Sequence, residues 1–381
     1  MRLAVPNETT PGETRVAIVT DTIKRLVAKK VDVSVETHAG ERSFIRDDDY
    51  RAAGATIEPS ADALFAKADV VVQIHPPTKS QIAKLREGST LISLLYPLSN
   101  AELVRALAAR RVTAISADMI PRTTLAQSMD VLSSQTTAAG YHGVLLAAAS
   151  LPKFFPMLMT AAGTIPPAKV LVLGAGVAGL QAIATARRLG AVVEAFDVRR
   201  AVKEQVQSLG AKFVEVEGMS DAQAAGGYAR EITEDEKLRQ SEAIKRHIAK
   251  SDVCITTALV PGRRAPILIT AEMVRGMRPG SVIVDLAAEQ GGNCELCKPG
   301  QVIVEGGVTI IGTPNLQAKV AIDASQMYSR NMEKLLFHLL GSDGALKIDL
   351  GEEITKGCVI THNGEVVHPK VAELVTAKGA A

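Results

Sequence analysis

Cysteines, long apolar runs and a leader-like N-terminus are scarce or missing in this chain of 381 residues. Four cysteines are too few for the disulfide framework of a small secreted domain. No apolar run reaches the roughly 18 residues of a membrane-spanning helix, and Met1 opens a predicted strand, not a charged segment followed by an apolar signal core. These shortages predict a cytoplasmic protein with no direct membrane span.

Net charge and aromatic residues are also scarce. Lys and Arg number 43 against 41 Asp and Glu, which leaves a formal charge of +2, and aromatic residues make up 3% of the chain. A nucleic-acid-binding protein concentrates basic residues in a patch or stripe, and this sequence has no basic stripe interleaved with aromatic residues. Because 47% of the residues are hydrophobic, a core is easily built. The composition favours a globular protein that binds small molecules and no nucleic acid.

Two of the cysteines, Cys294 and Cys297, have the Cys-x-x-Cys spacing of redox and zinc sites. A structural zinc ion needs four ligands, and no second cysteine pair or nearby group of histidines supplies the other two. We therefore predict no metal site and interpret the spacing as chance.

The N-terminal third repeats short apolar strands and helices. Strands that alternate with helices imply a parallel sheet covered on both faces. The predicted strands cover residues 3–6, 31–36, 70–74, 90–94 and 112–116, and the predicted helices cover residues 21–29, 48–53, 61–67, 81–85 and 101–109. A chain of this length fits two domains of ordinary size, and the sheet of the first ends near Ala117.

The chain is organised around residues 169–199, where strand, glycine turn, helix, strand and acid follow one another. Gly174 allows a tight turn, Gly176 lets the backbone approach a pyrophosphate, and Gly179 lets the helix pack closely on the strand. Unpaired amides and the positive dipole end at the helix N-terminus favour an anion. This pattern predicts a dinucleotide-binding domain.

Asp197, after the second strand of this pattern, indicates which dinucleotide binds. It lies 197 − 174 = 23 residues after Gly174, close to the ~20 at which a carboxylate takes the adenosine ribose hydroxyls. A carboxylate there would repel a 2′-phosphate, so we predict NAD(H) and not NADP(H). Arg199 and Arg200 favour the opposite choice, because an arginine near this position accommodates the phosphate in some sites.

The remaining segments connect or extend these domains. We predict a helix over about residues 129–149, a second helix at 152–160 and a linker at 163–167. Residues 217–233 form a long segment rich in glycine, alanine and polar residues, which is typical of either a disordered insertion or a functional lid. Its one aromatic residue, Tyr228, favours a flap that closes over the nucleotide. A long amphipathic helix at 317–340 returns to the first domain. Further strands are predicted at residues 212–216, 253–257, 282–286 and 308–312, and further helices at 234–250 and 271–276.

We therefore expect an α/β protein with two Rossmann-like, doubly wound parallel-sheet domains joined by long helices, with a cleft between them. The first domain is discontinuous, because the tail is expected to pack on it, and comprises residues 1–133 and 325–381. The second domain, residues 134–324, binds the dinucleotide.

Several motifs are rarer than a glycine turn. The most specific are Ala126-Gln-Ser-Met-Asp130 and Gly226-Gly-Tyr228. The others are Pro11-Gly-Glu-Thr-Arg-Val-Ala17, Arg122, Ser133-Ser134-Gln135, Met159-Thr-Ala-Ala-Gly-Thr164, Thr256-Thr-Ala258, Asp285-Leu-Ala-Ala-Glu289 and Gly291-Gly-Asn-Cys294. Over nearly its whole length the chain resembles the NAD(H)-binding α1 subunit, or domain I, of proton-translocating nicotinamide nucleotide transhydrogenases, relatives of alanine dehydrogenase.

The resemblance implies an enzyme in which NADH bound to this chain passes hydride to NADP⁺ on a separate domain. Its implied partners are a second copy of the chain, the NADP(H)-binding domain of a β subunit and a membrane α2 subunit, which would hold the chain at the inner face of the plasma membrane. The implied catalytic residues, around the nicotinamide, are Arg122, Gln127, Asp130 and Ser133. The implied cofactor-binding residues are Gly174, Ala175, Gly176, Val177, Gly179, Asp197, Val198, Arg199, Tyr228, Thr257, Ala258 and Leu259.

The sequence also departs from the family and leaves alternatives open. Asn7 stands where the family commonly has lysine, and Leu125 stands where it often has a second arginine. An alanine or related amino-acid dehydrogenase would need a base and cations, for which the chain offers His75 and Arg15. A non-catalytic NAD sensor would keep the fold alone. Asp130 is also a good helix N-cap.

Overall fold

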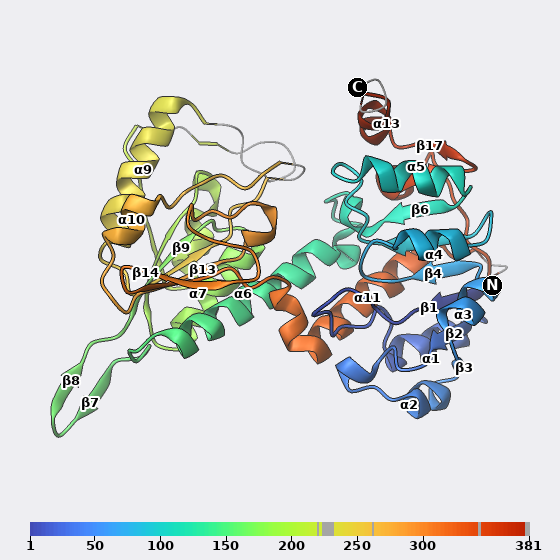
Figure 1. Ribbon diagram of the computed structural model, residues 1–381, viewed down its shortest axis with the longest axis horizontal. Coiled ribbons are helices and arrows are strands. Elements are labelled where there is room, and N and C mark those ends of the chain that lie inside the picture. Colours follow the sequence, from blue (N-terminus) through green and yellow to red (C-terminus); the bar gives the residue numbers. More distant parts are fainter. Residues whose placement is uncertain (219–220, 223–231, 261–262, 342–343, 378–381) are drawn as a thin grey trace. The chain divides into compact units, whose positions relative to one another are not determined.

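The computed structural model describes residues 1–218, 221–222, 232–260, 263–341 and 344–377 (Figure 1). The chain forms two compact units, one of Met1–Gln135 with Ala318–Ala381 and the other of Thr136–Gln317. The second unit thus covers residues 136–317. The sequence analysis predicted residues 134–324 for this domain. Each unit is built on a large, mainly parallel sheet, so the predicted α/β fold class is confirmed.

Within the described residues, eight strands form the sheet of the first unit, in the order β17-β16-β6-β5-β4-β1-β2-β3. The strands are β1 (Arg2–Val5), β2 (Asp32–Glu36), β3 (Thr56–Glu58), β4 (Val70–Val72), β5 (Thr90–Ser93), β6 (Thr113–Ser116), β16 (Val359–His362) and β17 (Glu365–Val366). Neighbours from β3 to β6 are parallel, whereas β16 and β17 add antiparallel at one edge. The C-terminal tail therefore extends the first sheet.

Helices cover both faces of this sheet, because successive side chains of a strand point to opposite sides. Leu3 and Val5 of β1 pack with Leu335 of α11, whereas Ala4 packs with Leu107 of α5. The helices are α1 (Thr20–Ala28), α2 (Asp47–Ala52), α3 (Ala61–Lys67), α4 (Lys79–Lys84), α5 (Ala101–Ala109), α11 (Ala321–Leu339), α12 (Glu353–Cys358) and α13 (Pro369–Ala377).

In the second unit, seven strands of the described residues form a sheet in the order β11-β10-β9-β12-β13-β15-β14. The strands are β9 (Lys169–Leu173), β10 (Val192–Phe196), β11 (Lys212–Phe213), β12 (Val253–Thr256), β13 (Val282–Asp285), β14 (Val302–Glu305) and β15 (Val308–Ile311). Only the β14–β15 pair among these is antiparallel. After β11 the chain returns to the other side of β9, so the strand order reverses there, which is where such sheets bind ligands.

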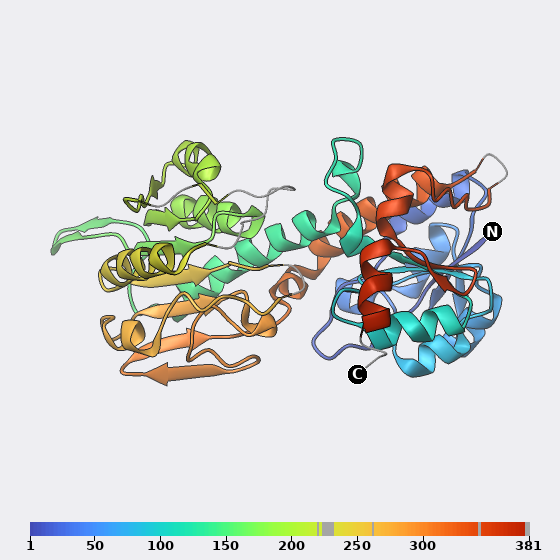
Figure 2. The same ribbon diagram turned by 90° about the horizontal axis from the view of Figure 1, so that it is seen from above.

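The second sheet also lies between two layers of helices (Figure 2). Val170 and Val172 of β9 pack with Ile183 of α7, while Leu171 of the same strand packs with Ile244 of α9. Among the described residues, the helices that lie wholly in this unit are α7 (Val177–Arg188), α8 (Lys203–Ser208), α9 (Glu234–Ile248) and α10 (Ala271–Arg275), and most of α6 (Val131–Ser150) belongs to it as well. The alternation along β9 is that of a strand buried on both faces.

The predicted helix at residues 152–160 is wrong. Its last residues form β7 (Leu158–Thr160), which pairs antiparallel with β8 (Gly163–Ile165), and this hairpin projects from the second unit (Figure 1). Pro156 has no N–H to donate inside a helix, and Gly163 adopts a φ of +119° that suits a turn. The segment predicted as a linker at 163–167 therefore begins with a strand.

The other predicted elements differ from the structure mainly at their ends, whereas α8, α12, β16, β17 and α13 were not predicted as individual elements. The long helix predicted over 129–149 is α6 (Val131–Ser150), and the strand predicted at 212–216 ends at Phe213. The sequence analysis missed β3 and β14, because each has few buried residues and lies at a sheet edge. No helix in the part of the chain that the structure describes is long and apolar enough to cross a membrane.

Candidate dinucleotide site

A glycine turn joins β9 to α7 where the strand order reverses. Gly174 has a φ of +98°, and a Cβ there would lie 2.6 Å from the Thr257 hydroxyl oxygen. A Cβ on Gly179 would lie 1.8 Å from the Gly174 carbonyl oxygen, so α7 can pack this closely only with glycine. A Cβ on Gly176 would meet its nearest atom, on Arg199, at 4.0 Å. Gly176 therefore borders space that a ligand can approach.

The N-terminus of α7 lies beside Gly176. Val177 is the first helical residue, and the Leu180 amide makes an early helical bond to the Gly176 carbonyl. The first amides of any helix have no acceptor within it. Together with the positive end of the helix dipole, these amides form a place for a phosphate.

Asp197 lies just after β10 and is held against the glycine turn. Its Oδ2 accepts a hydrogen bond from the Ala175 amide at 2.7 Å. Arg199 donates to both carboxylate oxygens, from Nε to Oδ1 at 2.9 Å and from Nη2 to Oδ2 at 2.7 Å, and its amide donates to Oδ1 at 2.9 Å. The sequence thus correctly placed the acid beside the turn, while its pairing with Arg199 was not foreseen.

A cavity of about 310 Å³ opens beside Asp197. Val198 and Val216 provide apolar surface, and the exposed Arg200 lies among the lining residues. The lining residues are Phe196, Asp197, Val198, Arg200, Lys203, Phe213, Val214, Glu215 and Val216. The lining of this cavity thus combines apolar and charged side chains, and the Asp197 carboxylate lies at its edge.

The loop after β12 closes the other side of the glycine turn. The Thr257 hydroxyl donates to the Gly174 carbonyl at 3.0 Å. Asn293, which is fully buried, accepts from the Ala258 amide at 3.0 Å and donates to the Ala258 carbonyl at 2.9 Å. The backbone amide of Asn293 in turn donates to the buried Asp285 carboxylate at 2.7 Å. The third predicted residue of this loop, Leu259, is partly exposed.

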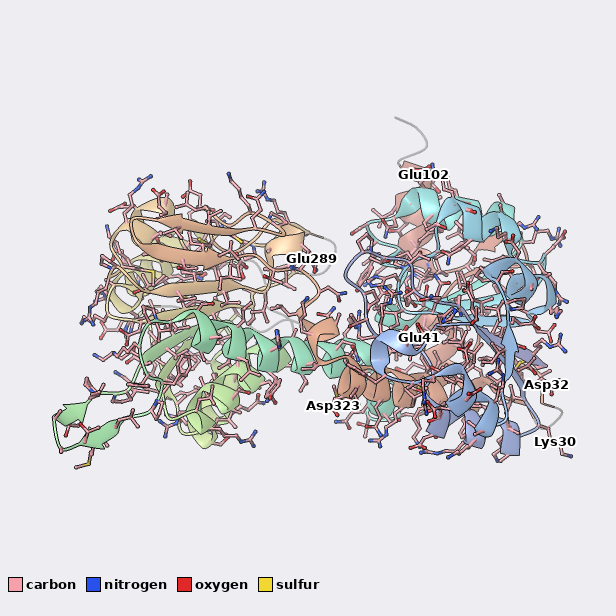
Figure 3. The ribbon with its side chains drawn as sticks, turned by 60° about the horizontal axis from the view of Figure 1, so that its bottom comes forward. Lys30, Asp32, Glu41, Glu102, Glu289 and Asp323 are labelled. Atoms are coloured by element: carbon pink, nitrogen blue, oxygen red, sulfur yellow. The ribbon has the colours of Figure 1, made fainter. Side chains whose placement is uncertain are left out.

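Sequence reasoning did not give Asp285 and Asn293 a role, although both stand in motifs that carried the family resemblance. Asp285 also accepts from the Thr256 hydroxyl at 2.9 Å, so it ties the end of β12 to the end of β13. Glu289, labelled in Figure 3, follows in the turn after β13 and accepts from the Asn315 amide at 3.2 Å. The signal in the sequence was a pair of polar residues, Asp285 and Asn293, at and after the end of an apolar strand. Their hydrogen-bond partners could not be predicted from one sequence.

In the first unit, a loop carries the four residues implied at the nicotinamide. Asn331 of α11 donates to the backbone of this loop at 2.8 Å and so fixes it. Gln127 and Arg122 are exposed. The Asp130 carboxylate accepts from the Ser133 amide at 2.9 Å and from its hydroxyl at 2.6 Å, which is the geometry of an N-cap on α6. Asp130 therefore has a structural role whatever else it contacts.

A cluster of buried charged groups lies after β1 and β4 in the first unit. Arg15 donates from Nε and Nη2 to the two oxygens of Glu13, at 2.8 and 2.6 Å, and from Nη1 to Gln135 at 2.7 Å. His75 Nε2 lies 2.6 Å from Glu13 Oε2. Burial alone would raise the pKa of Glu13, but hydrogen bonds from Arg15 and His75 outweigh it and lower that pKa well below its ordinary value.

Two more carboxylates at this edge hold backbone amides. Glu8 accepts from the Ile74 amide at 2.5 Å, and Asp118 accepts from the amides of Leu95 and Tyr96 at 3.0 and 3.2 Å. Burial raises the pKa of Glu8 to about 6 and also raises that of Asp118. The edge of the first sheet is therefore occupied by the chain's own acids.

The cysteine thiols show no sign of activation. Burial raises the pKa of Cys294 to about 11 and that of Cys297 to about 12, so both stay protonated and weakly nucleophilic near neutral pH. Among the described residues, no group of three or more His, Cys, Asp or Glu side chains is arranged to hold a metal ion. Tyr228, predicted in the flap, lies outside the described residues.

The second unit thus combines a strand, a tight glycine turn, a helix N-terminus and an acid-ended strand at a reversal of strand order. This combination defines a dinucleotide-binding α/β domain of the oxidoreductase type. Its residues fit a dinucleotide, since space opens at Gly176 and at the cavity beside Asp197.

Comparison with known proteins narrows this class. Residues 4–139 match the N-terminal domain, and residues 143–369 the C-terminal domain, of the alanine dehydrogenase/PNT family. The chain is 47% identical to an NAD(P) transhydrogenase alpha-subunit protein of Rhodospirillum rubrum, over 100% of both chains. A transhydrogenase structure from Sinorhizobium meliloti superposes with a TM-score of 0.88 at 44% identity, covering 96% of this chain and 100% of the other. An L-alanine dehydrogenase structure gives a TM-score of 0.83 at 27% identity, over 99% of each.

The chain belongs to the alanine dehydrogenase/PNT family, on its NAD(P) transhydrogenase alpha-subunit branch. The resemblance inferred from the sequence motifs is thereby confirmed.

Proposed function

We propose that this chain is the NAD(H)-binding component of a proton-translocating transhydrogenase, in which NADH on the second unit reduces NADP⁺ on a separate partner domain. The observation that carries the proposal is the Asp197 site on the glycine turn, in a chain 47% identical over its full length to a transhydrogenase alpha subunit. Asp197 favours a dinucleotide with free ribose hydroxyls, which fits NAD(H) here and leaves NADP(H) to the partner.

Each part of the site has one task in binding. The α7 amides and Gly176 receive the pyrophosphate, Asp197 receives the adenosine ribose, and Val198 lines the adenine cavity. Thr257, Ala258 and Leu259 border the nicotinamide half, with Ala258 held on both sides by Asn293. The nicotinamide, once bound, supplies the hydride. Rigid backing of the loop keeps that half of the cofactor in one orientation.

The first unit contributes positioning groups rather than an acid or base. Hydride that moves directly between two nicotinamides requires no proton transfer, so an amide such as Gln127 serves as well as a titratable group. Gln127 and Arg122 are exposed on the loop that Asn331 fixes, where they are able to contact cofactor or partner. Asp130 and Ser133 hold the beginning of α6 and thereby the loop itself.

The dehydrogenase alternative finds little support at the corresponding edge of the first unit. A 2-oxo acid would need a cation for its carboxylate, and the Arg15 guanidinium is already bound to Glu13 at 2.6 and 2.8 Å. His75, the candidate base, is held by the same Glu13. These contacts favour a structural cluster over a catalytic one.

The partners follow from the same proposal. A homodimer is supported by the β7–β8 hairpin, which projects from the second unit (Figure 1), since a two-stranded hairpin is marginally stable alone. Met159 of β7 is 79% exposed, and Phe154 and Met157, in the segment before β7, are 54 and 57% exposed. The NADP(H)-binding β subunit and the membrane α2 subunit would hold the chain peripherally at the inner face of the plasma membrane.

A mixed assay tests the proposal. The purified chain, the NADP(H)-binding domain of a related transhydrogenase, NADH and an NADP⁺ analogue are combined, and reduction of the analogue is recorded. We expect reduction only when both proteins are present. Oxidation of NADH with pyruvate and ammonia, without the partner domain, would instead establish the dehydrogenase alternative. NADH binding with neither reaction would leave the sensor alternative.

A further inference from the structure

The acceptor capacity of the Asp197 carboxylate is filled within the protein. A carboxylate offers about four lone-pair sites, two on each oxygen. Oδ1 accepts from the Arg199 amide and Nε, and Oδ2 accepts from the Ala175 amide and Arg199 Nη2, all between 2.7 and 2.9 Å. Both side chains are largely buried, with 6% of Asp197 and 16% of Arg199 exposed. No site remains for another donor.

A dinucleotide brings two further donors to this carboxylate. The adenosine ribose carries two adjacent hydroxyls. Each loses its hydrogen bond to water on binding and therefore needs an acceptor in the protein. The backbone amides of Ala175 and Arg199 are fixed by the turn and the strand end, so they cannot leave. The guanidinium of Arg199 is the only one of these donors on a flexible side chain, and it therefore is the one displaced.

We propose that Arg199 is an affinity-setting competitor of the adenosine ribose: its guanidinium occupies the Asp197 carboxylate in the ligand-free protein and must release it when NAD(H) binds. This inference rests on the proposed NAD(H) site and changes the role of Arg199 from a ribose contact to a group that opposes ribose binding. Breaking the bidentate, charge-assisted hydrogen bonds between Arg199 and Asp197 costs free energy. This cost offsets part of the binding free energy gained from the ribose hydroxyls. The competition lowers affinity and so favours release of the cofactor after each transfer.

Arg199 also neutralises Asp197 before the ribose binds. A buried carboxylate without a partner is costly, and Arg199 supplies that partner until the ribose arrives. Arg200, the next residue, serves as a matched control. Its side chain is exposed at the cavity, and its backbone amide donates to Asp221 at 3.0 Å. Arg200 therefore provides the same charge in the same region without the bidentate hydrogen bonds that Arg199 makes to Asp197.

The test compares NADH with NADH that contains 2′-deoxyadenosine, using calorimetric titration of the full chain. For each protein we take the dissociation constant of the 2′-deoxy compound divided by that of NADH. This ratio reports what the 2′-hydroxyl contributes to binding, whatever else the side chain does. Arg199→Met should raise this ratio roughly 10-fold over the unmodified chain, because the 2′-hydroxyl then gains its hydrogen bond to the charged carboxylate without displacing the guanidinium. Arg199→Lys replaces the bidentate guanidinium with a single ammonium group and should raise the ratio less. Arg200→Met should leave it within about 2-fold.

Four results would overturn the proposal. An unchanged or lower ratio in Arg199→Met would show that Arg199 does not compete with the hydroxyl. An equal rise in Arg200→Met would show a general effect of charge. A rise that persists when Arg199→Met is combined with Asp197→Asn would show that Asp197 is not the contested acceptor. Failure of the unmodified chain to bind NADH at all would overturn the proposed function as well, and is distinguished by that first titration. Circular dichroism melting of each variant verifies that it is folded.

Discussion

The two sheets share a doubly wound topology but differ at the edge where their parallel strands end. In the first unit, Glu8 and Asp118 bind the backbone amides after β4 and β5, and Glu13 binds Arg15. In the second unit, a glycine turn leads into a helix whose first amides border a space near Gly176. At the edge of the first sheet, the chain's own carboxylates bind the backbone amides. At the edge of the second sheet, the backbone amides at the start of α7 remain able to bind an anionic group of a ligand. Topology alone therefore does not make a binding site.

The largest expected effect comes from the glycine turn. Gly179→Ala would place a Cβ 1.8 Å from the Gly174 carbonyl oxygen, so it should lower the free energy of unfolding by about 3 kcal/mol and abolish NADH binding. Gly176→Ala has room for its Cβ, with 4.0 Å to the nearest atom, and should leave stability within about 0.5 kcal/mol. It should still weaken NADH at least ~100-fold by blocking the pyrophosphate.

Urea unfolding followed by circular dichroism and NADH titration measure these two effects. The comparison between the units breaks down if Gly176→Ala binds NADH as the unmodified chain does. It also breaks down if a change at the edge of the first unit, such as Glu8→Gln, abolishes NADH binding in a protein that remains folded.

Asp197 should give the next largest effect. Asp197→Ala removes the ribose acceptor and should weaken NADH roughly 30-fold, about 2 kcal/mol. Because the negative charge that repels a 2′-phosphate is also removed, the preference for NADH over NADPH should narrow. Fluorescence titration with both cofactors measures this. Equal or tighter NADPH binding by the unmodified chain would show that Arg199 and Arg200 set the specificity.

The edge of the first unit should respond to pH. Burial raises the pKa of Glu8 from 4.5 to about 6 in the folded chain, so its contribution to stability is present below pH 4.5 and is lost as pH rises through 6. The difference corresponds to about 2 kcal/mol. The free energy of unfolding of Glu8→Gln, measured from pH 4.5 to 7 by urea and circular dichroism, should lack this loss. Parallel curves for both proteins would refute the assignment.

The smallest predicted effect separates positioning from binding. Gln127→Asn shortens the side chain by one methylene and should slow single-turnover hydride transfer to the partner domain at least ~10-fold, because orientation is lost. The NADH dissociation constant should change less than ~5-fold, since most of the contact area lies on the adenosine half. A dissociation constant that rises in proportion to the rate loss would make Gln127 a binding residue only.

How far the sequence predicted this molecule depended on the distance between interacting residues. The glycine turn and Asp197 could be predicted because one local pattern of strand, turn, helix and strand specifies them. The edge of the first unit could not, since Arg15 and Gln135 meet across 120 residues of sequence. The same holds for Asn293, which supports Ala258 from 35 residues away. The prediction of a helix at 152–160 was wrong for a local reason, because Pro156 disfavours a helix there.

The most direct test of the account follows one isotope through one turnover. NADH deuterated at the transferred position is mixed with this chain, the NADP(H)-binding partner domain and NADP⁺, and the products are analysed by mass spectrometry. Direct transfer between two bound nicotinamides predicts one deuterium in each NADPH formed and none lost to water. At the same subsaturating NADH concentration, far less NADPH should form when Gly176→Ala replaces the unmodified chain. Deuterium lost to solvent, or transfer that proceeds undiminished with Gly176→Ala, would contradict the assignment of the second unit's edge as the site of the hydride donor.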